Sequence, residues 1–235
     1  IRFALEQEPT GGILQNMLEA GELPLRVTHN DTKLNNVLLD KATRKGLCVL
    51  DLDTVMPGLS VHDFGDSIRF GAATAAEDEP DASKMKLDLH LFEVYTRGFL
   101  EAAPSLTQKE IDMLALGALT MTLEVGIRFL KDYLDGDLYF KTAYDNHNLI
   151  RARTQLALVA DMKTKWTDME SIVKKVAKEI AKIYNCHKGE FRSKEMHFYD
   201  SGACSALNVL CDKLDIVPMH RNKLGGGTGE MLENE

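Results

Sequence analysis

Between Leu25 and Asp53 the chain alternates short apolar runs with polar turns, and this order constrains the fold more than any other feature. The runs are too short for helices and are typical of strands. Three short buried strands are therefore predicted, at residues 25–28, 37–39 and 47–50. Gly46 closes a polar turn between the second and third runs. This turn predicts a β-hairpin that sets Asp51 beside Asn36.

The loop between the first two predicted strands carries groups suited to phosphoryl transfer. Its sequence, His29-Asn30-Asp31-Thr32-Lys33-Leu34-Asn35-Asn36, keeps the His, Asp and Asn of the kinase pattern H-R-D-L-x-x-x-N. In that chemistry an Asp accepts the proton of the substrate hydroxyl, and an Asn five residues later holds Mg²⁺. We therefore predict Asp31 as catalytic base and Lys33 as the ammonium that reaches the migrating phosphoryl group. The alternative is that Asp31 and Asn36 are only turn residues.

Asp51 and Asp53 follow the third predicted strand. Mg²⁺ takes a few protein oxygens together with nucleotide phosphates, so Asn36, Asp51 and Asp53 predict a half-site for Mg²⁺ and ATP. The alternative is that both acids are solvated loop residues. A second pattern competes, because Asp63-Phe64-Gly65 spells the metal triplet of protein kinases. It follows a loop rich in Pro, Gly and Ser instead of a strand, so the metal is not assigned to Asp63.

Three segments stand out together: THNDTKLNN at 28–36, LDLDTVMPG at 50–58 and HDFGDSIR at 62–69. With them, the chain up to about residue 175 resembles the aminoglycoside phosphotransferase and choline kinase superfamily, and it is most similar to bacterial N-acetylhexosamine 1-kinases. The resemblance implies Asp31 as catalytic base, and Asn36 and Asp51 as Mg²⁺ ligands. It implies that His29 orders the loop. It also implies that Asp66 supports the loop by hydrogen bonding; capping of the next helix is the alternative.

After residue 80 the apolar residues recur with the period of a helix. The predicted helices are 87–103, which Pro104 stops; 107–133, which a capping box at Thr107 and Glu110 opens; 146–165; and one from a capping box at Thr167 and Glu170 toward Tyr184. We therefore expect an α+β fold that resembles the C-terminal lobe of protein kinases. It would be mostly helical, with a short β-hairpin carrying the catalytic loop.

The segment from Ile1 to Arg26 suggests at most a helix and a linker, with Thr10-Gly11-Gly12 as breaker. Gly11-Gly12 is no phosphate loop, because no Gly-Lys-Ser/Thr follows it. Kinases of this kind hold the nucleotide phosphates with an N-terminal sheet lobe. We therefore expect residues 1–175 to form a C-terminal lobe whose partner, the N-terminal sheet lobe, is missing. Residues 176–235 would add a helix and a tail, with the Gly-rich, acidic residues 224–235 disordered.

A dense polar set lies near the end of the second long predicted helix: Glu124, Arg128, Lys131, Asp132 and Tyr139. Sugar hydroxyls favour Arg, carboxylates and aromatic rings, and the resemblance supports Arg128 and Tyr139 as acceptor contacts. The alternative is a solvated helix face with ion pairs from Arg128 to Glu124 and Asp132. An aminoglycoside is polycationic and would favour a more acidic pocket than Arg128 and Lys131 suggest. This favours a neutral sugar.

The net charge of −8 argues against nucleic acid and acidic membranes as partners. No apolar run approaches the roughly 20 residues of a membrane helix, and no signal peptide is visible, so we expect a cytoplasmic protein. The cysteines and histidines near the C-terminus lack the paired spacing of a zinc site: Cys186, His187, Cys204, Cys211 and His220.

Two classes of function follow. The first is an ATP- and Mg²⁺-dependent phosphotransferase that acts on the anomeric hydroxyl of an N-acetylhexosamine, or a kinase of the same superfamily for choline, homoserine or an aminoglycoside. The second is a non-catalytic fragment or binding module that keeps the lobe but cannot hold nucleotide. Because no nucleotide lobe is identifiable, we expect the 235-residue chain to be inactive as a kinase on its own.

Overall fold

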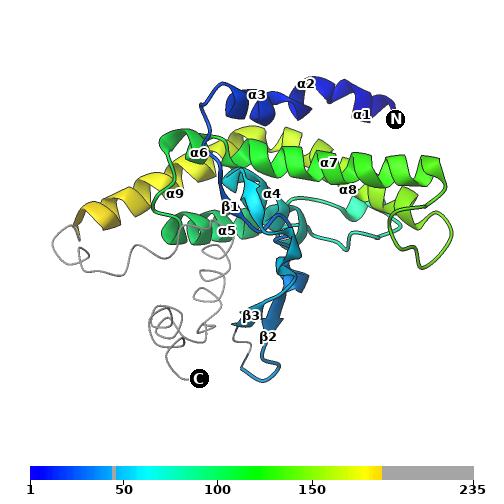
Figure 1. The fold of residues 1–235 in the computed structure, drawn as a ribbon, viewed down its shortest axis with the longest axis horizontal. Coiled ribbons are helices and arrows are strands. Elements are labelled where there is room, and N and C mark those ends of the chain that lie inside the picture. The colour runs from blue at the N-terminus through cyan, green and yellow to red at the C-terminus, as the bar shows by residue number, and fades with distance from the viewer. Residues whose placement is uncertain (44–45, 187–235) are drawn as a thin grey trace, which may run out of the picture.

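The computed structural model describes residues 1–43 and 46–186, and helices make up most of them (Figure 1). The α-helices are α1 (Arg2–Glu6), α2 (Glu8–Gly11), α3 (Ile13–Glu19), α4 (Ser60–Gly71), α5 (Leu89–Ala102), α6 (Gln108–Asp112), α7 (Leu114–Asp135), α8 (His147–Thr164) and α9 (Trp166–Cys186). Short 3₁₀ turns are η1 (Leu34–Asn36), η2 (Leu52–Thr54) and η3 (Ala82–Lys84). The predicted tail at 224–235 and the zinc candidates from His187 onward lie outside the described residues.

The strands form two separate antiparallel pairs. β2 (Val37–Leu39) pairs with β3 (Gly46–Val49), which confirms the predicted hairpin, and Figure 1 shows it projecting from the helical body. The Leu50 N–H donates to the Asn36 carbonyl at 2.8 Å, so the residue that follows, Asp51, comes next to Asn36. The mostly helical fold with small sheets is compatible with the expected α+β class.

The second pair joins β1 (Arg26–Thr28) to β4 (Met56–Gly58), a strand that the sequence does not predict. Pro57 and Gly58 favour turns, but Pro is tolerated in a two-stranded pair because one side of each strand needs no partner. Gly58 is required by close approach, since a Cβ on it would lie 2.3 Å from the Thr28 hydroxyl oxygen. The pair fixes both ends of the segment that contains the loop and the hairpin.

The strands are not the buried strands that their apolar runs predict. Val27 and Met56 in one pair, and Leu38 and Leu47 in the other, are exposed. The physical reason is that each sheet has only two strands, so no second layer covers the outer face. An apolar run alone does not distinguish a covered strand from an open one.

The core lies between the helices. α7 packs along α8 and across α4, while α9 packs on α5 (Figure 1). Phe64 of α4 meets Phe92 and Phe99 of α5 edge to face, with ring centroids 5.9 and 5.2 Å apart. α4 therefore sits in the middle of the core, with its first turn directed toward the loop that follows β1.

Three predicted helix boundaries need correction. The capping box at Thr107 and Glu110 is present, but it opens the short α6, whose C-cap is Met113, where φ is −94° and ψ 0°, before α7 begins. The second predicted box is absent, because α9 begins at Trp166, one residue before Thr167. The segment before β1 holds α1, α2 and α3 instead of one helix and a linker, since Gly11 and Gly12 adopt helical backbone angles.

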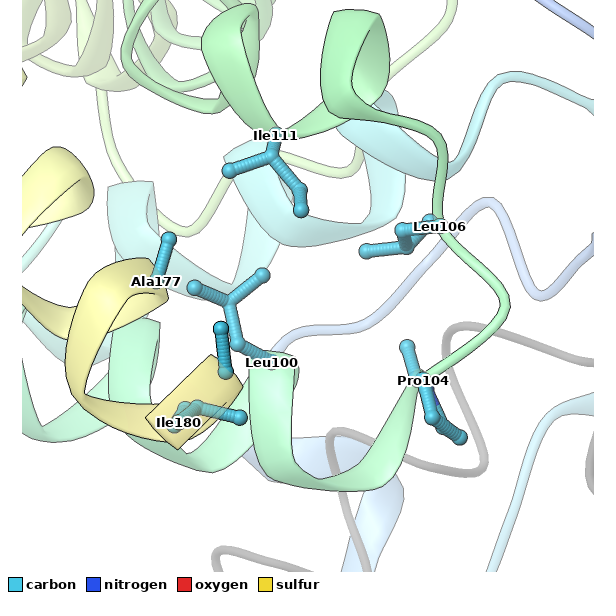
Figure 2. A pocket seen from close by; sticks show the side chains of 8 residues that line it. Leu100, Pro104, Leu106, Ile111, Ala177 and Ile180 are labelled. Atoms are coloured by element: carbon cyan, nitrogen blue, oxygen red, sulfur yellow. The ribbon is translucent and has the colours of Figure 1, made fainter. Parts of the chain in front are cut away.

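α9 continues without a break through residue 175, the predicted domain boundary. Val176 and Ile180, beyond that residue, are buried in the same core as α5. Near this end of α9 an apolar cleft of about 140 Å³ opens between α5, α6 and α9, with Leu100, Ile111 and Ile180 among its walls (Figure 2). Its lining is aliphatic, so it offers no polar group for chemistry.

Candidate active site

The loop after β1 has a fixed backbone. Asn30 has φ 63°, in the left-handed region that Asn tolerates better than most residues. Its side chain is held on both sides: Oδ1 accepts from the Thr28 hydroxyl at 2.9 Å, and Nδ2 donates to the Thr54 carbonyl at 3.0 Å. The conformation of Asn30 turns the chain sharply between His29 and Asp31, so the Asp31 side chain leaves the loop at a defined place.

The predicted base, Asp31, lies at the centre of the loop. Its Oδ2 accepts from Lys33 Nζ at 2.6 Å and from Asn36 Nδ2 at 2.7 Å, and Asn36 Nδ2 also donates to the Asp31 carbonyl. Burial raises the pKa of Asp31, but the hydrogen bonds from Lys33 and Asn36 outweigh burial and leave it below its usual range. Asp31 is therefore ionised at neutral pH, as a proton acceptor must be.

His29 is almost fully buried, and both of its ring nitrogens are engaged. Nδ1 accepts the Asp31 N–H at 3.3 Å, and Nε2 lies 3.0 Å from the Leu50 carbonyl, which needs a proton on Nε2. The ring thus connects the loop to the end of β3. This geometry agrees with a loop-ordering role, because neither nitrogen is left to exchange a proton with a substrate.

Asp63, the acid of the competing metal triplet, lies in the first turn of α4 and supports the loop by hydrogen bonding. Its Oδ2 and Oδ1 accept the backbone N–H groups of His29 and Asn30, each at 2.8 Å, and its carbonyl accepts the Thr32 hydroxyl at 2.6 Å. The carboxylate is 1% exposed, so it has no access to a metal held by phosphates in solvent. Burial raises the pKa of Asp63 to about 6.

The implied loop-bracing role of Asp66 is therefore wrong, and so is the alternative as a helix cap. Asp66 lies inside α4 and pairs with Arg69, with Oδ1 2.8 Å from Nη2. Its Oδ2 is buried with no hydrogen-bond partner among the described residues. The two acids are three residues apart and lie on the same side of the helix, so their order along the chain could not distinguish the brace from the ion pair.

The two acids after β3 lie beside each other in solvent. Asp51 has φ 62°, in the left-handed region that Asp tolerates better than most residues other than Gly and Asn. A hydrogen bond between the Asp51 and Asp53 carboxyl groups, with their mutual repulsion, raises the pKa of Asp51, and the Asp31 charge adds to it. Asn36 Oδ1 accepts no hydrogen bond within the described chain. The charges and the open oxygen suit a hard cation.

No three His, Cys, Asp or Glu side chains form a ready-made metal cluster within residues 1–43 and 46–186. A cation at Asp51 would therefore need oxygens from a substrate to complete its ligands. This is the usual arrangement for Mg²⁺ at a nucleotide, where phosphates and waters supply most ligands. The residues present fit such a half-site.

An anchor that the sequence analysis missed attaches this region to the helices. Arg26 of β1 binds Glu110 of α6 through two bonds of 2.8 Å, and Ser60 at the start of α4 donates to the same carboxylate at 2.7 Å. Glu110 also accepts the Thr107 N–H. The capping box was visible in the sequence, but its link to Arg26, 84 residues away, was not.

The predicted acceptor residues lie on α7 and on the turn after it. The Arg128 guanidinium lies 5.9 Å from the Tyr139 ring centroid and 5.4 Å from that of Phe140, and it approaches Glu124 at 3.8 Å. The expected pairing of Arg128 with Asp132 is absent, because Asp132 turns inward. Lys131 instead pairs with Asp135. Neither Arg128 nor Tyr139 contacts Asp31 in the described structure.

Polar groups nevertheless follow one another from the loop toward Tyr139. Asp63 binds the loop, and its neighbour His62 is close enough to Glu124 for that charge to act on the imidazole. Burial is the larger influence and lowers the pKa of His62. Glu124 is next to Arg128 on α7, and Arg128 lies over Tyr139. Polar groups thus extend from the loop along one face of α7.

The comparison with known families addresses the loop directly. Residues 3–98 match the phosphotransferase enzyme family. The match covers the loop, the hairpin and α4, so it contains Asp31, Asn36, Asp51 and Asp63. It supports the resemblance to the aminoglycoside phosphotransferase and choline kinase superfamily, and with it a kinase-type enzyme. α7 and Tyr139 lie outside the match.

Among the helices that the structure describes, there is no candidate for a membrane span, because none combines the length and the apolar character that a span requires.

Proposed function

We propose that this chain is the catalytic and acceptor-binding part of a phosphotransferase that moves a phosphoryl group from ATP to a small-molecule hydroxyl. The observation that carries the proposal is the Asp31 carboxylate, ionised and held by Lys33 and Asn36. Asp31 accepts the acceptor's hydroxyl proton as the oxygen attacks the γ-phosphorus, while the bond from the γ-phosphorus to the bridging oxygen breaks and ADP leaves. Lys33 is then near enough to offset charge on the transferred group.

Mg²⁺ would be held by Asn36 and Asp51, with Asp53 beside them. Bound there, the ion neutralises phosphate charge and helps to orient the phosphates. The chain's own contribution is to place these oxygens at one point. The Asn36 carbonyl receives the Leu50 N–H, and the left-handed backbone of Asp51 redirects the chain immediately after the strand. The repulsion that raises the pKa of Asp51 would be relieved by a cation.

For the acceptor we propose an N-acetylhexosamine, phosphorylated on its anomeric hydroxyl. Arg128 and Tyr139 offer a guanidinium and an exposed ring, a pair suited to hydroxyl groups and to one face of a sugar. The region also carries Lys131, which disfavours a polycationic aminoglycoside. The described residues hold no glycine-rich phosphate loop, and we propose that a separate nucleotide-holding lobe completes the clamp on ATP.

The test is transfer from ATP to N-acetylglucosamine and N-acetylgalactosamine, with choline, homoserine and an aminoglycoside as competing acceptors. The 235-residue chain is assayed alone and, where its gene encodes a longer product, within that product. Asp31→Asn should lower kcat by about 10²-fold or more while nucleotide affinity stays nearly unchanged. Asp168→Asn, an exposed acid on α9, is the matched control and should change neither value.

The outcomes separate the parts of the proposal. Equal turnover by Asp31→Asn and the wild type would overturn the base. Phosphorylation of choline, homoserine or the aminoglycoside in place of both sugars would overturn the acceptor. Turnover near 1 s⁻¹ by the 235-residue chain alone, roughly the low end for enzymes, would overturn the need for a separate nucleotide lobe.

A further inference from the structure

The end of α7 holds a buried carboxylate with an unusual number of donors. Asp132 accepts the backbone N–H groups of Leu138, Tyr139 and Phe140 at 3.0, 2.8 and 2.9 Å, and the Asn148 side-chain amide at 2.9 Å. A carboxylate has about four acceptor positions, so Asp132 is fully used. Burial raises its pKa, but the backbone donors outweigh burial and lower it below its usual range.

The turn between α7 and these donors is fixed at several points. Gly136 has φ 95° and Asp137 φ 59°, so two successive residues adopt the left-handed region. The Asp137 N–H donates to the Asp132 carbonyl at 2.8 Å. Asn148, fully buried in the first turn of α8, donates to the Asp137 carboxylate as well as to Asp132. One carboxylate and one amide thus join α7, the turn and α8.

What this arrangement holds in place is an exposed aromatic ring. Tyr139 is 75% exposed, although its backbone N–H ends on a buried acid. Phe140, next to it, packs on Phe129 with ring centroids 4.7 Å apart, and it meets the Tyr139 ring edge to face at 4.8 Å. Arg128 lies near both the Tyr139 and Phe140 rings. An exposed ring on a fixed backbone loses little conformational entropy when a ligand stacks on it.

The C-terminus of α7 does not require the hydrogen bonds to Asp132 for its own capping. Gly136 in the left-handed region already satisfies the last carbonyls of α7. Three more backbone donors directed at one acid serve the segment after the turn and not the helix itself. The network therefore specifies where residues 138–140 lie relative to α7.

We propose that Asp132 is a positioning residue for acceptor recognition: it fixes residues 138–140 so that the Tyr139 ring and the Arg128 guanidinium form one rigid platform for the acceptor. This inference rests on the proposed function, which places the acceptor at Tyr139. It adds that affinity for the acceptor depends on a buried acid that never touches it. Asn148 assists by occupying the remaining position on the carboxylate.

The test is the affinity for N-acetylglucosamine, measured by calorimetry on the full chain and, where turnover is present, as KM. Asp132→Asn leaves at least one backbone N–H without its acceptor and should raise the dissociation constant about tenfold. The KM for ATP and kcat should stay within about twofold. Asp135→Asn, an exposed acid one turn further on the same helix, is the matched control and should leave the affinity unchanged.

A double-mutant cycle with Tyr139→Ala distinguishes positioning from general destabilisation. If Asp132 acts through the ring, Asp132→Asn should cost little further affinity once Tyr139 is Ala. The inference would be overturned if the two substitutions reduced the affinity additively. It would also be overturned if Asp132→Asn lowered kcat and raised both KM values by similar factors. If Asp132→Asn fails to fold, Asn148→Ala, which leaves the carboxylate in place, takes its position in the cycle. It should raise the constant in the same direction by a smaller factor.

The two proposals fail in different ways. If Tyr139→Ala leaves the affinity for N-acetylglucosamine unchanged, the acceptor binds elsewhere, and both the proposed acceptor site at Tyr139 and the positioning role of Asp132 are overturned. If Tyr139→Ala weakens binding and Asp132→Asn does not, the acceptor site stands and the positioning role is overturned.

Discussion

At the scale of single residues, Asp63 shows how burial and hydrogen bonding oppose each other. Its carboxylate accepts two backbone N–H groups, which favour the charged form, yet burial is the larger effect and the pKa rises to about 6. The contribution of Asp63 to the free energy of unfolding is therefore largest where it is protonated in both states. It falls as the pH rises from the unfolded value near 3.8 through 6, because only the native state still holds the proton.

Asp63→Asn should separate these two effects. The amide can accept only one of the two N–H groups, so the variant should be less stable than the wild type at pH 4 by about 1–3 kcal/mol. Asn does not titrate, so the deficit should shrink by up to roughly 3 kcal/mol between pH 4 and pH 7. Urea unfolding at pH 4, 5, 6 and 7 measures the difference. If the stability deficit of the variant grows with pH, the hydrogen bonds from the two N–H groups outweigh burial and the pKa of Asp63 is depressed.

The metal assignment can be tested at the two competing acids. Asp51→Ala should abolish the Mg²⁺ dependence of nucleotide binding, because it removes a carboxylate from the open pair. Asp63→Ala should lower stability and leave the Mg²⁺ response in place, because its carboxylate is buried under the loop. Titration of Mg²⁺ into each variant with nucleotide present decides between them. Loss of the response in Asp63→Ala alone would restore the literal triplet as the metal site.

At the scale of elements, the contact between α4 and α7 depends on two glycines. A Cβ on Gly65 would lie 2.3 Å from the Gly117 carbonyl oxygen, and a Cβ on Gly117 would lie 2.2 Å from the Val61 carbonyl oxygen. Both clashes are with backbone, so no side chain can move to relieve them. This close approach fixes the position of the first turn of α4, which carries Asp63, along the axis of α7.

Gly65→Ala should therefore force the two helices apart and lower the free energy of unfolding by about 1–3 kcal/mol or more. The matched control is Gly11→Ala at the end of α2, where nothing lies within 4 Å of the added Cβ. That change should be neutral or stabilise by up to about 1 kcal/mol, since Ala restricts the unfolded chain. Chemical denaturation of both variants measures the effect. Equal stabilities would mean that the helix contact tolerates a methyl group.

The elements also show what the sequence could predict. The hairpin of β2 and β3 was predictable because a short polar run that ends in Gly46 separates two apolar runs, which is a local sequence signal for a turn. β4 was not, because Pro57 and Gly58 have turn chemistry and pair only with β1, which lies on the far side of the loop and the hairpin in the sequence. Met113 lies inside a continuous helical pattern, so the break between α6 and α7 comes from packing rather than from local preference.

The candidate site followed the same rule. Asp31, Asn36 and Asp51 were predictable as neighbours, because a loop and a hairpin of adjacent residues bring them together. The support of the loop by Asp63 was not predictable. Asp63 and Asp66 are equally polar, and which of them meets the loop depends on how α4 is rotated against a loop that is distant in the sequence. The rotation is fixed by Gly65 against Gly117, a contact between distant parts of the chain. The inward rotation of Asp132 was not predictable for the same reason: the sequence placed it in a polar set near Arg128, either in an acceptor pocket or on a solvated helix face.

At the scale of the whole molecule, the helices share one core that includes α9. Val173, Val176 and Ile180 belong to the same buried cluster as Phe99 and Leu100 of α5. Arg97 of α5 also pairs with Glu179 at 2.7 Å. The predicted boundary at residue 175 therefore falls within a packed helix, and the body that folds together extends to the end of the described part of α9.

Two shortened chains test this extent. A chain of residues 1–186 keeps α9 and should show the same cooperative urea unfolding as the 235-residue protein. A chain of residues 1–175 loses Val176 and Ile180 from the core. Each lost aliphatic side chain costs about 2–5 kcal/mol, against a total stability of roughly 5–15 kcal/mol, so the shorter chain should be largely unfolded or lack a cooperative transition. Equal unfolding midpoints for the two chains would mean that the second half of α9 is dispensable and that residue 175 is a true boundary.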